Sequence, residues 1–280
     1  MIRPSIRIIR KVKRLYNAFT RPLRRHALDV VTHLPFSHFY FRPLFLNELY
    51  MALGLWEPYV FKSLNLTEGD VFIDVGAHIG THSVYASQQV GKTGLVIAIE
   101  PDRRNLHLLR LNLAGKSNVC ILERAVGPEG IIYLDSRNDP LYTRAAKHSG
   151  ANREEVRSIA LDSLTEVVKR LKENMKYSVL VKIDVEGGEI DVVEGGRMFF
   201  AQFHPTLIIE SLKPRKLRKI LERLGFCGYR LFESYYLFRF EANPFKKEAE
   251  CSCDKEGMHA VTEPQTEACM HACELKTVFK

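Results

Sequence analysis

The chain has 280 residues, of which 46% are hydrophobic and 26% are charged, a composition typical of a globular protein. It contains no uncharged apolar run of 18 residues, so the sequence predicts no membrane-spanning helix. Basic residues interrupt the N-terminal region where a secretory signal would need an apolar core. We therefore expect a cytoplasmic protein.

The net charge of +8 is concentrated at the N-terminus, where nine basic residues precede the first acidic residue, Asp29. This uneven distribution disfavours a nucleic-acid-binding surface spread over the whole protein. Apolar residues recur among these charges at near-helical spacing: Ile8, Ile9, Val12, Leu15, Tyr16 and Phe19. A basic amphipathic helix is suited to an anionic membrane surface, so residues 1–25 predict a peripheral membrane contact. Packing on the rest of the protein and binding of RNA phosphates are the alternatives.

From Val71 onward, short β-rich runs alternate with amphipathic stretches, which is typical of a parallel sheet covered by helices. The predicted strands are 71–75, 95–99, 119–122, 131–134, 158–161, 179–183 and 206–209. The predicted helices are 79–90, one capped by Asp102, 162–173 capped by Asp162, 189–200 and 214–224. Residues 231–232 and 236–240 predict a closing antiparallel pair. The polar segment 135–155, which includes Arg137, Tyr142, Arg144, Lys147 and His148, is interpreted as one long loop, either a substrate lid or an unstructured insertion.

The segment Phe72–Gly80 combines a strand, a glycine turn and a helix start. Gly76 allows a sharp turn and a close approach of a ligand, and Gly80 permits tight contact at the start of the helix. The free N–H groups of the helix N-terminus suit a carboxylate or a phosphate. Asp74 ends the strand at the edge of the sheet where ligands bind in α/β proteins.

Glu100 follows Gly80 by 20 residues and ends the second strand, where an acidic side chain hydrogen-bonds the ribose hydroxyls of a nucleoside. The glycine spacing differs from the Gly-x-Gly-x-x-Gly of dinucleotide-binding proteins. A ligand with a carboxylate and an ammonium at one end and a ribose at the other fits both features. S-adenosylmethionine is such a ligand, and the alternative is a glycine turn that binds nothing.

A second motif follows the fourth predicted core strand and places Asp184, Glu186 and Glu189 at the same rim of the sheet. Carboxylates there suit a bound sulfonium, and one of them can take a proton from an attacking hydroxyl. Asp184 and Glu186 are the leading candidates for this base, followed by His82. The alternative for Glu186 and Glu189 is that they begin a helix, where acidic residues are favourable without any function.

With these two motifs the sequence resembles the FkbM family of methyltransferases. The resemblance rests on residues 72–80, Glu100-Pro101, residues 160–164, and residues 182–187 continuing to Glu194-Gly195, and it spans residues 57–240. It implies a class I methyltransferase fold, with a mostly parallel seven-stranded sheet, helices on both faces and an antiparallel C-terminal strand. It also implies transfer of a methyl group to a hydroxyl oxygen. His78 departs from the family's pattern, which commonly has asparagine at this position.

The resulting division is a basic arm and helical lead-in over 1–56, a methyltransferase domain over 57–243 and a tail over 244–280. The predicted cofactor-binding residues are Asp74, Gly76, Ala77, His78, Gly80, Thr81, Glu100, Pro101, Arg124, Ala125 and Asp184. We expect a hydroxyl acceptor on a sugar, a lipid-linked compound or a secondary metabolite. An RNA methyltransferase that uses the arm and a non-catalytic nucleoside-binding module are the alternatives.

Four cysteines gather in the tail: Cys251, Cys253, Cys269 and Cys273, with His259 between them. These are suitable zinc ligands, but their spacing is not the usual pair of Cys-x-x-Cys motifs. A zinc site and a tail with reduced thiols both remain open, and no metal is assigned to the catalytic site.

Overall fold

The computed structural model describes residues 16, 20, 31–34, 39–135, 144–146, 153–173 and 175–241. The basic amphipathic arm, apart from Tyr16 and Thr20, lies outside the described residues, as does the cysteine-containing tail. Most of the predicted loop also lies outside them. Within the described ranges, none of the helices has both the length and the apolar character needed to cross a membrane.

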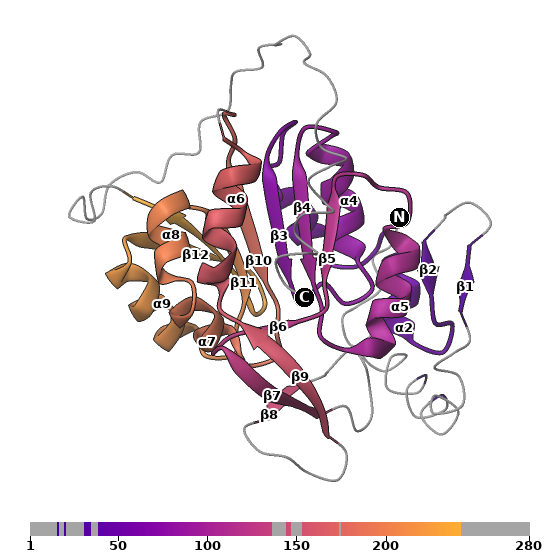
Figure 1. The fold of residues 1–280 in the computed structure, drawn as a ribbon. Helices are drawn as coiled ribbons and strands as arrows, with labels where there is room; N and C mark the ends of the chain where they lie inside the picture. Colours follow the sequence, from indigo (N-terminus) through magenta and orange to yellow (C-terminus); the bar gives the residue numbers. More distant parts are fainter. Residues whose placement is uncertain are drawn as a thin grey trace, which may run out of the picture.

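A seven-stranded sheet forms the centre of the molecule, in the order β12-β13-β11-β10-β3-β4-β5 (Figure 1). Its parallel strands are β3 (Val71–Val75), β4 (Leu95–Ile99), β5 (Val119–Leu122), β10 (Val179–Ile183) and β11 (Thr206–Glu210). The strands β12 (Phe226–Phe232) and β13 (Tyr235–Phe240) run antiparallel at one edge. The strand order reverses between β3 and β10, which is where α/β sheets bind their ligands. The predicted class I methyltransferase fold is confirmed.

Helices cover both faces of this sheet, which explains why its central strands are mainly apolar. One face is covered by α3 (Pro58–Ser63), α4 (Thr81–Gln89) and α5 (Arg103–Asn112), and the other by η2 (Leu161–Leu164), α6 (Thr165–Leu171), α7 (Glu189–Glu194), α8 (Arg197–Phe203) and α9 (Pro214–Arg223). Neighbouring residues of β3 face opposite ways: Phe72 packs with Leu106 of α5, and Ile73 packs with Phe200 of α8. Each such buried side chain contributes about 1.5–3 kcal/mol to the free energy of unfolding.

A second, four-stranded sheet lies beside the rim of the first and corrects two predictions. Its strands are β6 (Ala125–Val126), β7 (Gly130–Asp135), β8 (Arg144–Ala146) and β9 (Arg153–Ile159), in the order β6-β9-β7-β8. The prediction of one loop over 135–155 was wrong, because β8 and the start of β9 fall inside it. The predicted strand 158–161 is the end of β9 followed by η2. Only Val156 and Ser158 of β9 are buried, so its alternation is too polar to be recognised as a strand.

Two helix predictions also change. The predicted helix 189–200 is divided into α7 and α8 at Gly195-Gly196, where a Cβ on Gly196 would lie 2.9 Å from the Leu161 side chain. Asp162 does not cap α6; its carboxylate accepts a hydrogen bond of 2.8 Å from the Phe199 N–H and so joins η2 to α8. The predicted cap of α5 is confirmed, because Asp102 accepts from the Arg104 N–H at 2.9 Å.

The lead-in before the main sheet consists of β1 (Thr32–His33), β2 (Tyr40–Phe41) and α2 (Leu46–Ala52). It is attached to α5 by polar contacts in a buried environment. The fully buried Arg42 guanidinium pairs with Glu48 and donates to Asn105 Oδ1 at 2.8 Å. The lead-in thereby lies against the edge of the sheet where β3 and β4 end.

Candidate active site

A cavity of about 750 Å³ lies at the carboxyl ends of the central parallel strands, within the size range of small-molecule sites. Its wall combines the turn after β3, the end of β4, the segment after β5, the ends of β10 and β11, the β12–β13 turn and the lead-in. Among the lining residues are Trp56, Glu57, Tyr59, Gly76, Ala77, His78, Thr81, His82, Glu100, Pro101, Arg124, Ala125, Lys182, Asp184, Glu186, Glu210 and Tyr235. Seven elements distant in sequence therefore meet at one site.

The two motif glycines have different structural tasks. Gly76 has φ +82°, and a Cβ there would lie 1.9 Å from the carbonyl oxygen of Asp184. A side chain at this position is thus excluded by the backbone that follows β10. Gly80 has φ +91°, and its Cβ would lie 2.8 Å from the Leu109 side chain. Gly80 allows α4 to pack against α5 and is not among the residues that line the cavity.

Glu100 lies at the cavity wall and binds the turn after β3. Its carboxylate accepts from the N–H of His78 at 2.9 Å, the N–H of Asp102 at 3.0 Å and the amide of Asn105 at 3.3 Å. Burial raises the pKa of Glu100 to about 7, against the effect of these donors. The predicted ribose-binding carboxylate is therefore held by three donors in a fixed position on the cavity wall.

Buried polar atoms at the start of α4 have no hydrogen-bond partner within the described part of the chain. Among them are both ring nitrogens of His78 and the hydroxyl of Thr81, and both residues line the cavity. Burial, together with the charge of Arg42, lowers the pKa of His78 to about 3, so its ring is neutral. Buried polar groups are costly when unpaired, so these atoms fit a polar ligand at the N-terminus of α4.

Asp74 lies behind the glycine turn and is not among the cavity-lining residues. It is completely buried, accepts from the Ser83 hydroxyl at 2.7 Å and lies 3.8 Å from the ammonium of Lys182. The structure therefore joins Asp74 to α4 and β10, whereas Ala77, Pro101, Arg124 and Ala125 line the cavity as the sequence led us to expect.

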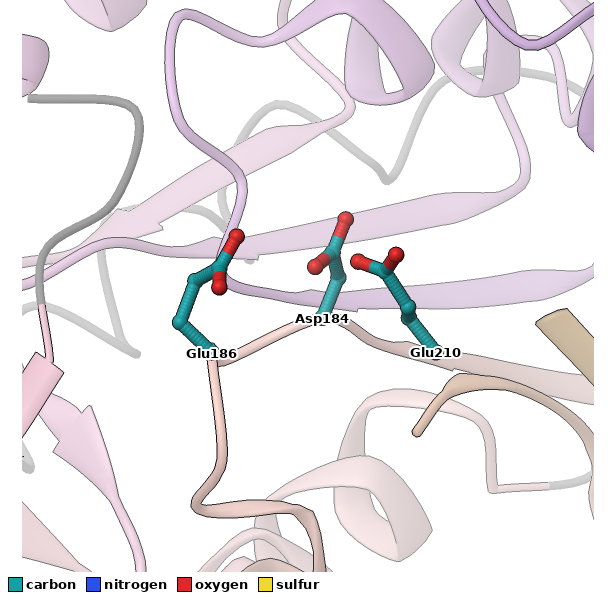
Figure 2. A group of neighbouring side chains, drawn as sticks. All are labelled: Asp184, Glu186 and Glu210. Carbon is teal, nitrogen blue, oxygen red and sulfur yellow. The ribbon is translucent and has the colours of Figure 1, made fainter. Parts of the chain in front are cut away.

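Three carboxylates lie side by side where β10 and β11 end, with Asp184 between Glu186 and Glu210 (Figure 2). Each offers an oxygen within 4.8 Å of the others. Asp184 Oδ2 accepts from the ammonium of Lys182 at 3.1 Å and from the hydroxyl of Tyr235 at 2.8 Å. Burial opposes ionisation of Asp184, but the charge of Lys182 lowers its pKa to about 2. Burial and the charge of Asp184 raise the pKa of Glu210 to about 8.

The structure brings the three predicted catalytic residues, Asp184, Glu186 and His82, to the same cavity. His82 is buried and stacks on Phe61 with a centroid distance of 4.7 Å. Burial and the charge of Lys182 lower the pKa of His82 well below its ordinary value. A neutral, stacked ring of this kind is typical of a packed wall residue.

Among the polar cavity residues that sequence reasoning missed are Glu57, Lys182, Glu210 and Tyr235. Lys182 had a signal, since residues two apart in a strand share a face and Asp184 follows it by two. Glu210 ends a predicted parallel strand and is therefore expected at the same rim. Glu57 had only its position before Pro58 at a helix start, which indicates a cap and not a site.

The family model for the methyltransferase FkbM domain matches residues 74–231, more than half of the chain. Methyltransferase sdnD of Sordaria araneosa is 22% identical over 200 residues, covering 61% of this chain and 77% of that protein. A probable cobalt-precorrin-6B C(15)-methyltransferase (decarboxylating) of Sulfurisphaera tokodaii is 33% identical over 78 residues, covering 28% of this chain and 41% of that one.

Among solved structures, methyltransferase FkbM from Methylobacillus flagellatus KT has 19% identity and a TM-score of 0.38, covering 63% of this chain and 45% of its own. The present chain thus spans less than half of that protein and of the precorrin methyltransferase. The family match contains the turn after β3, Glu100 and the carboxylates after β10, which are the residues on which the resemblance was based. The chain belongs to the methyltransferase FkbM domain family.

Proposed function

We propose that this protein transfers a methyl group from S-adenosylmethionine to a hydroxyl oxygen of an acceptor. The observation that carries the proposal is the single cavity into which both sequence motifs project. The turn after β3 and Glu100 form one half of it, and the carboxylates at the ends of β10 and β11 form the other. A donor and an acceptor bound in the two halves would be held next to each other, and such alignment is a major source of catalysis.

The residues of the first half suit the cofactor by their chemistry. The N–H groups at the start of α4, the neutral His78 ring and the Thr81 hydroxyl suit an amino-acid group. Glu100 suits the ribose hydroxyls, since its carboxylate retains acceptor capacity beside its three donors. When bound, S-adenosylmethionine supplies a methyl group activated by a positively charged sulfur.

The second half suits an uncharged acceptor. Asp184 stays ionised beside Lys182, and the two charges compensate each other. Glu186 adds a further acidic group, which disfavours an anionic acceptor. The aromatic side chains of Trp56 and Tyr59 make part of the cavity wall apolar. These features support a hydroxyl on a sugar, a lipid-linked compound or a secondary metabolite.

Calorimetric titration with S-adenosylmethionine and S-adenosylhomocysteine tests the proposal, with the Glu100→Ala variant beside the native protein. We expect micromolar binding that weakens about 10- to 100-fold in the variant, the equivalent of about 1.5–3 kcal/mol for hydrogen bonds to a charged group. Glu123→Ala, at an exposed position directly after β5, is the matched control. Absence of binding by the folded native protein would contradict the proposal.

Methyl transfer separates the remaining functions. Transfer to uncharged hydroxyl compounds supports the proposal, whereas transfer only to RNA would favour an RNA methyltransferase that uses the basic arm. Tight cofactor binding without transfer to either class would favour a non-catalytic nucleoside-binding module.

A further inference from the structure

Glu57 reaches the cavity from outside the segment that the family model matches, residues 74–231. It is the N-cap residue of α3 and has a left-handed backbone, with φ +43°, which is uncommon for glutamate. Its side chain is only 12% exposed. One carboxylate oxygen, Oε2, is buried and has no hydrogen-bond partner in the described ranges. A strained residue that holds an unpaired carboxylate oxygen at a cavity wall is suited to a function.

The second oxygen of Glu57 and an oxygen of Asp184 lie within hydrogen-bond distance of the same hydroxyl group. The Tyr235 hydroxyl lies 2.9 Å from Glu57 Oε1 and 2.8 Å from Asp184 Oδ2. A phenol has one hydrogen, so Tyr235 donates to only one of these carboxylates at a time. Asp184 is kept ionised by the ammonium of Lys182, 3.1 Å away. The competition ends when Glu57 becomes neutral, because a neutral carboxyl group is the weaker acceptor. This geometry favours a proton on Glu57 while Asp184 keeps its charge.

The charged and titratable groups around Glu57 come from every element packed against it. They are Tyr59 of α3, Asp74 of β3, His82 of α4, Lys182 and Asp184 at β10, Glu210 of β11 and Tyr235 of β13. Burial and the charge of Asp184 raise the pKa of Glu57 to about 7, although Lys182 and the Tyr235 hydrogen bond oppose the rise. His82 Nε2 lies 3.6 Å from Oε2, and that ring is neutral. A carboxyl group with a pKa near the working pH is effective in proton transfer.

We propose that Glu57 is the general base of the reaction and takes the proton of the acceptor hydroxyl on its free Oε2. The proposal rests on the proposed methyl transfer to oxygen. As the bond between methyl carbon and sulfur breaks, its electron pair stays on sulfur and a new carbon–oxygen bond forms. The hydroxyl proton passes to Glu57, which returns it to solvent after the product leaves.

Asp184 and Glu210 are less suited to this role. Asp184 has its Oδ2 occupied by Lys182 and Tyr235, and its low pKa makes it a weak base. Glu210 accepts from the Ser234 hydroxyl at 2.6 Å and is hydrogen-bonded to Asp184, so its pKa of about 8 leaves it mostly protonated at neutral pH. Asp184 and Lys182 act instead as a fixed charge pair that sets the protonation of Glu57.

Infrared titration tests the protonation of Glu57 without any acceptor. The C=O stretching band of protonated carboxyl groups is followed against pH in the full chain and in Glu57→Gln. We expect the difference between the two to contain one carboxyl band that disappears with a midpoint of about 7. Glu166→Gln, an exposed position on α6, is the matched control and keeps this band. The proposal would be overturned if the difference spectrum contained no carboxyl band that persists above the pH range in which an ordinary glutamate loses its proton.

Turnover tests the catalytic role. S-adenosylhomocysteine formation is measured with S-adenosylmethionine and three hydroxyl probes: n-octyl glucoside, 2-phenylethanol and phenol. Glu57→Gln is expected to lower the rate on the two alcohols about 100-fold or more and to abolish the rise in rate through about pH 7. The loss on phenol is smaller because its hydroxyl is a much stronger acid. Glu57→Asp, which keeps the carboxylate, recovers part of the rate.

Cofactor affinity separates this proposal from the proposed function. Glu57→Gln should bind S-adenosylhomocysteine as the native protein does, which also shows that the variant is folded. A native protein that fails to bind S-adenosylhomocysteine would contradict the proposed function, while the infrared titration would still decide the state of Glu57. A Glu57→Gln variant that binds and transfers methyl groups to the alcohols at the native rate and with the native pH dependence would overturn the role of Glu57 alone.

Discussion

The two halves of the cavity are built in different ways. Around Gly76, His78 and Glu100 the contacts involve the backbone: the N–H groups of His78 and Asp102 donate to Glu100, and the Asp184 carbonyl lies against Gly76. Around Glu57 and Asp184 they are held by side-chain contacts between elements far apart in sequence. The first half therefore depends on backbone shape, and the second depends on a balance of charges. Substitutions in the two halves should therefore destabilise the protein for different reasons.

The largest effect is expected from the charge pair of the second half. Lys182→Met removes the ammonium that lies 3.1 Å from Asp184 and 3.8 Å from Asp74. Breaking a buried pair on one side costs about 3–5 kcal/mol, and urea unfolding measures this loss. The double variant Lys182→Met/Asp184→Asn should recover part of it, because one uncompensated charge is then removed. If Lys182→Met were as stable as the native protein, the ammonium of Lys182 would not be stabilising the two carboxylates.

A somewhat smaller effect is expected from the backbone of the first half. Gly76→Ala combines a left-handed residue, at about 1–2 kcal/mol, with overpacking against the Asp184 carbonyl, at about 1–3 kcal/mol. Gly115→Ala is the matched control, since Gly115 also has a positive φ of +76° but its Cβ would meet nothing within 4 Å. The difference between the two free energies of unfolding isolates the steric part. Equal losses would mean that the turn after β3 can move away from β10.

The pH dependence of stability should distinguish the halves further. The pKa of Glu57 rises from 4.5 to about 7 on folding, so the folded state binds the proton more tightly. The contribution of protonated Glu57 to the free energy of unfolding is complete below pH 4.5 and is lost as the pH rises towards 7. Between pH 4.5 and 7 the free energy of unfolding should fall by about 1–3 kcal/mol more in the native protein than in Glu57→Gln, at about 1.4 kcal/mol per unit of pKa. Urea unfolding at several pH values measures this difference. If the free energies of unfolding of the two proteins changed with pH in parallel, the raised pKa of Glu57 would be contradicted.

The smallest effect is expected from metal removal. Asp184, Glu186 and Glu210 offer oxygens within 4.8 Å of one another, but the Lys182 ammonium already compensates Asp184. We predict that dialysis against EDTA leaves both S-adenosylhomocysteine affinity and methyl transfer unchanged. Loss of transfer that Mg²⁺ restores would instead assign the three carboxylates to a cation.

The sequence predicted the main sheet well because its evidence is local. The fully buried strands β3, β4 and β10 are mainly apolar, and their alternation with helices indicates that they are parallel. The polar strand β9 was only partly recognised, since few of its side chains are buried. The short strands β6 and β8 carry no alternation long enough to detect.

The candidate site divides in the same way. Gly76 and Glu100 could be recognised from spacing, because one strand and one helix separate them. Glu57 could not, because its role depends on contacts with Tyr235, 178 residues away, and with His82. The sequence also placed Asp74 at the ligand, whereas its contact with Ser83 shows that a motif residue can support the turn from behind.

The segment from the lead-in through α3 contributes Tyr50, Trp56, Glu57 and Tyr59 to the cavity, yet it precedes the residues that the family model matches. It is joined to the rest through Arg42 and Asn105, at the α5 side of the sheet. Acceptor preference can therefore diverge among relatives by replacement of this one segment, without any change in the strands that hold the cofactor. In a chimera that exchanges residues 39–66 between two family members, we expect the acceptor preference to be that of the protein from which this segment comes.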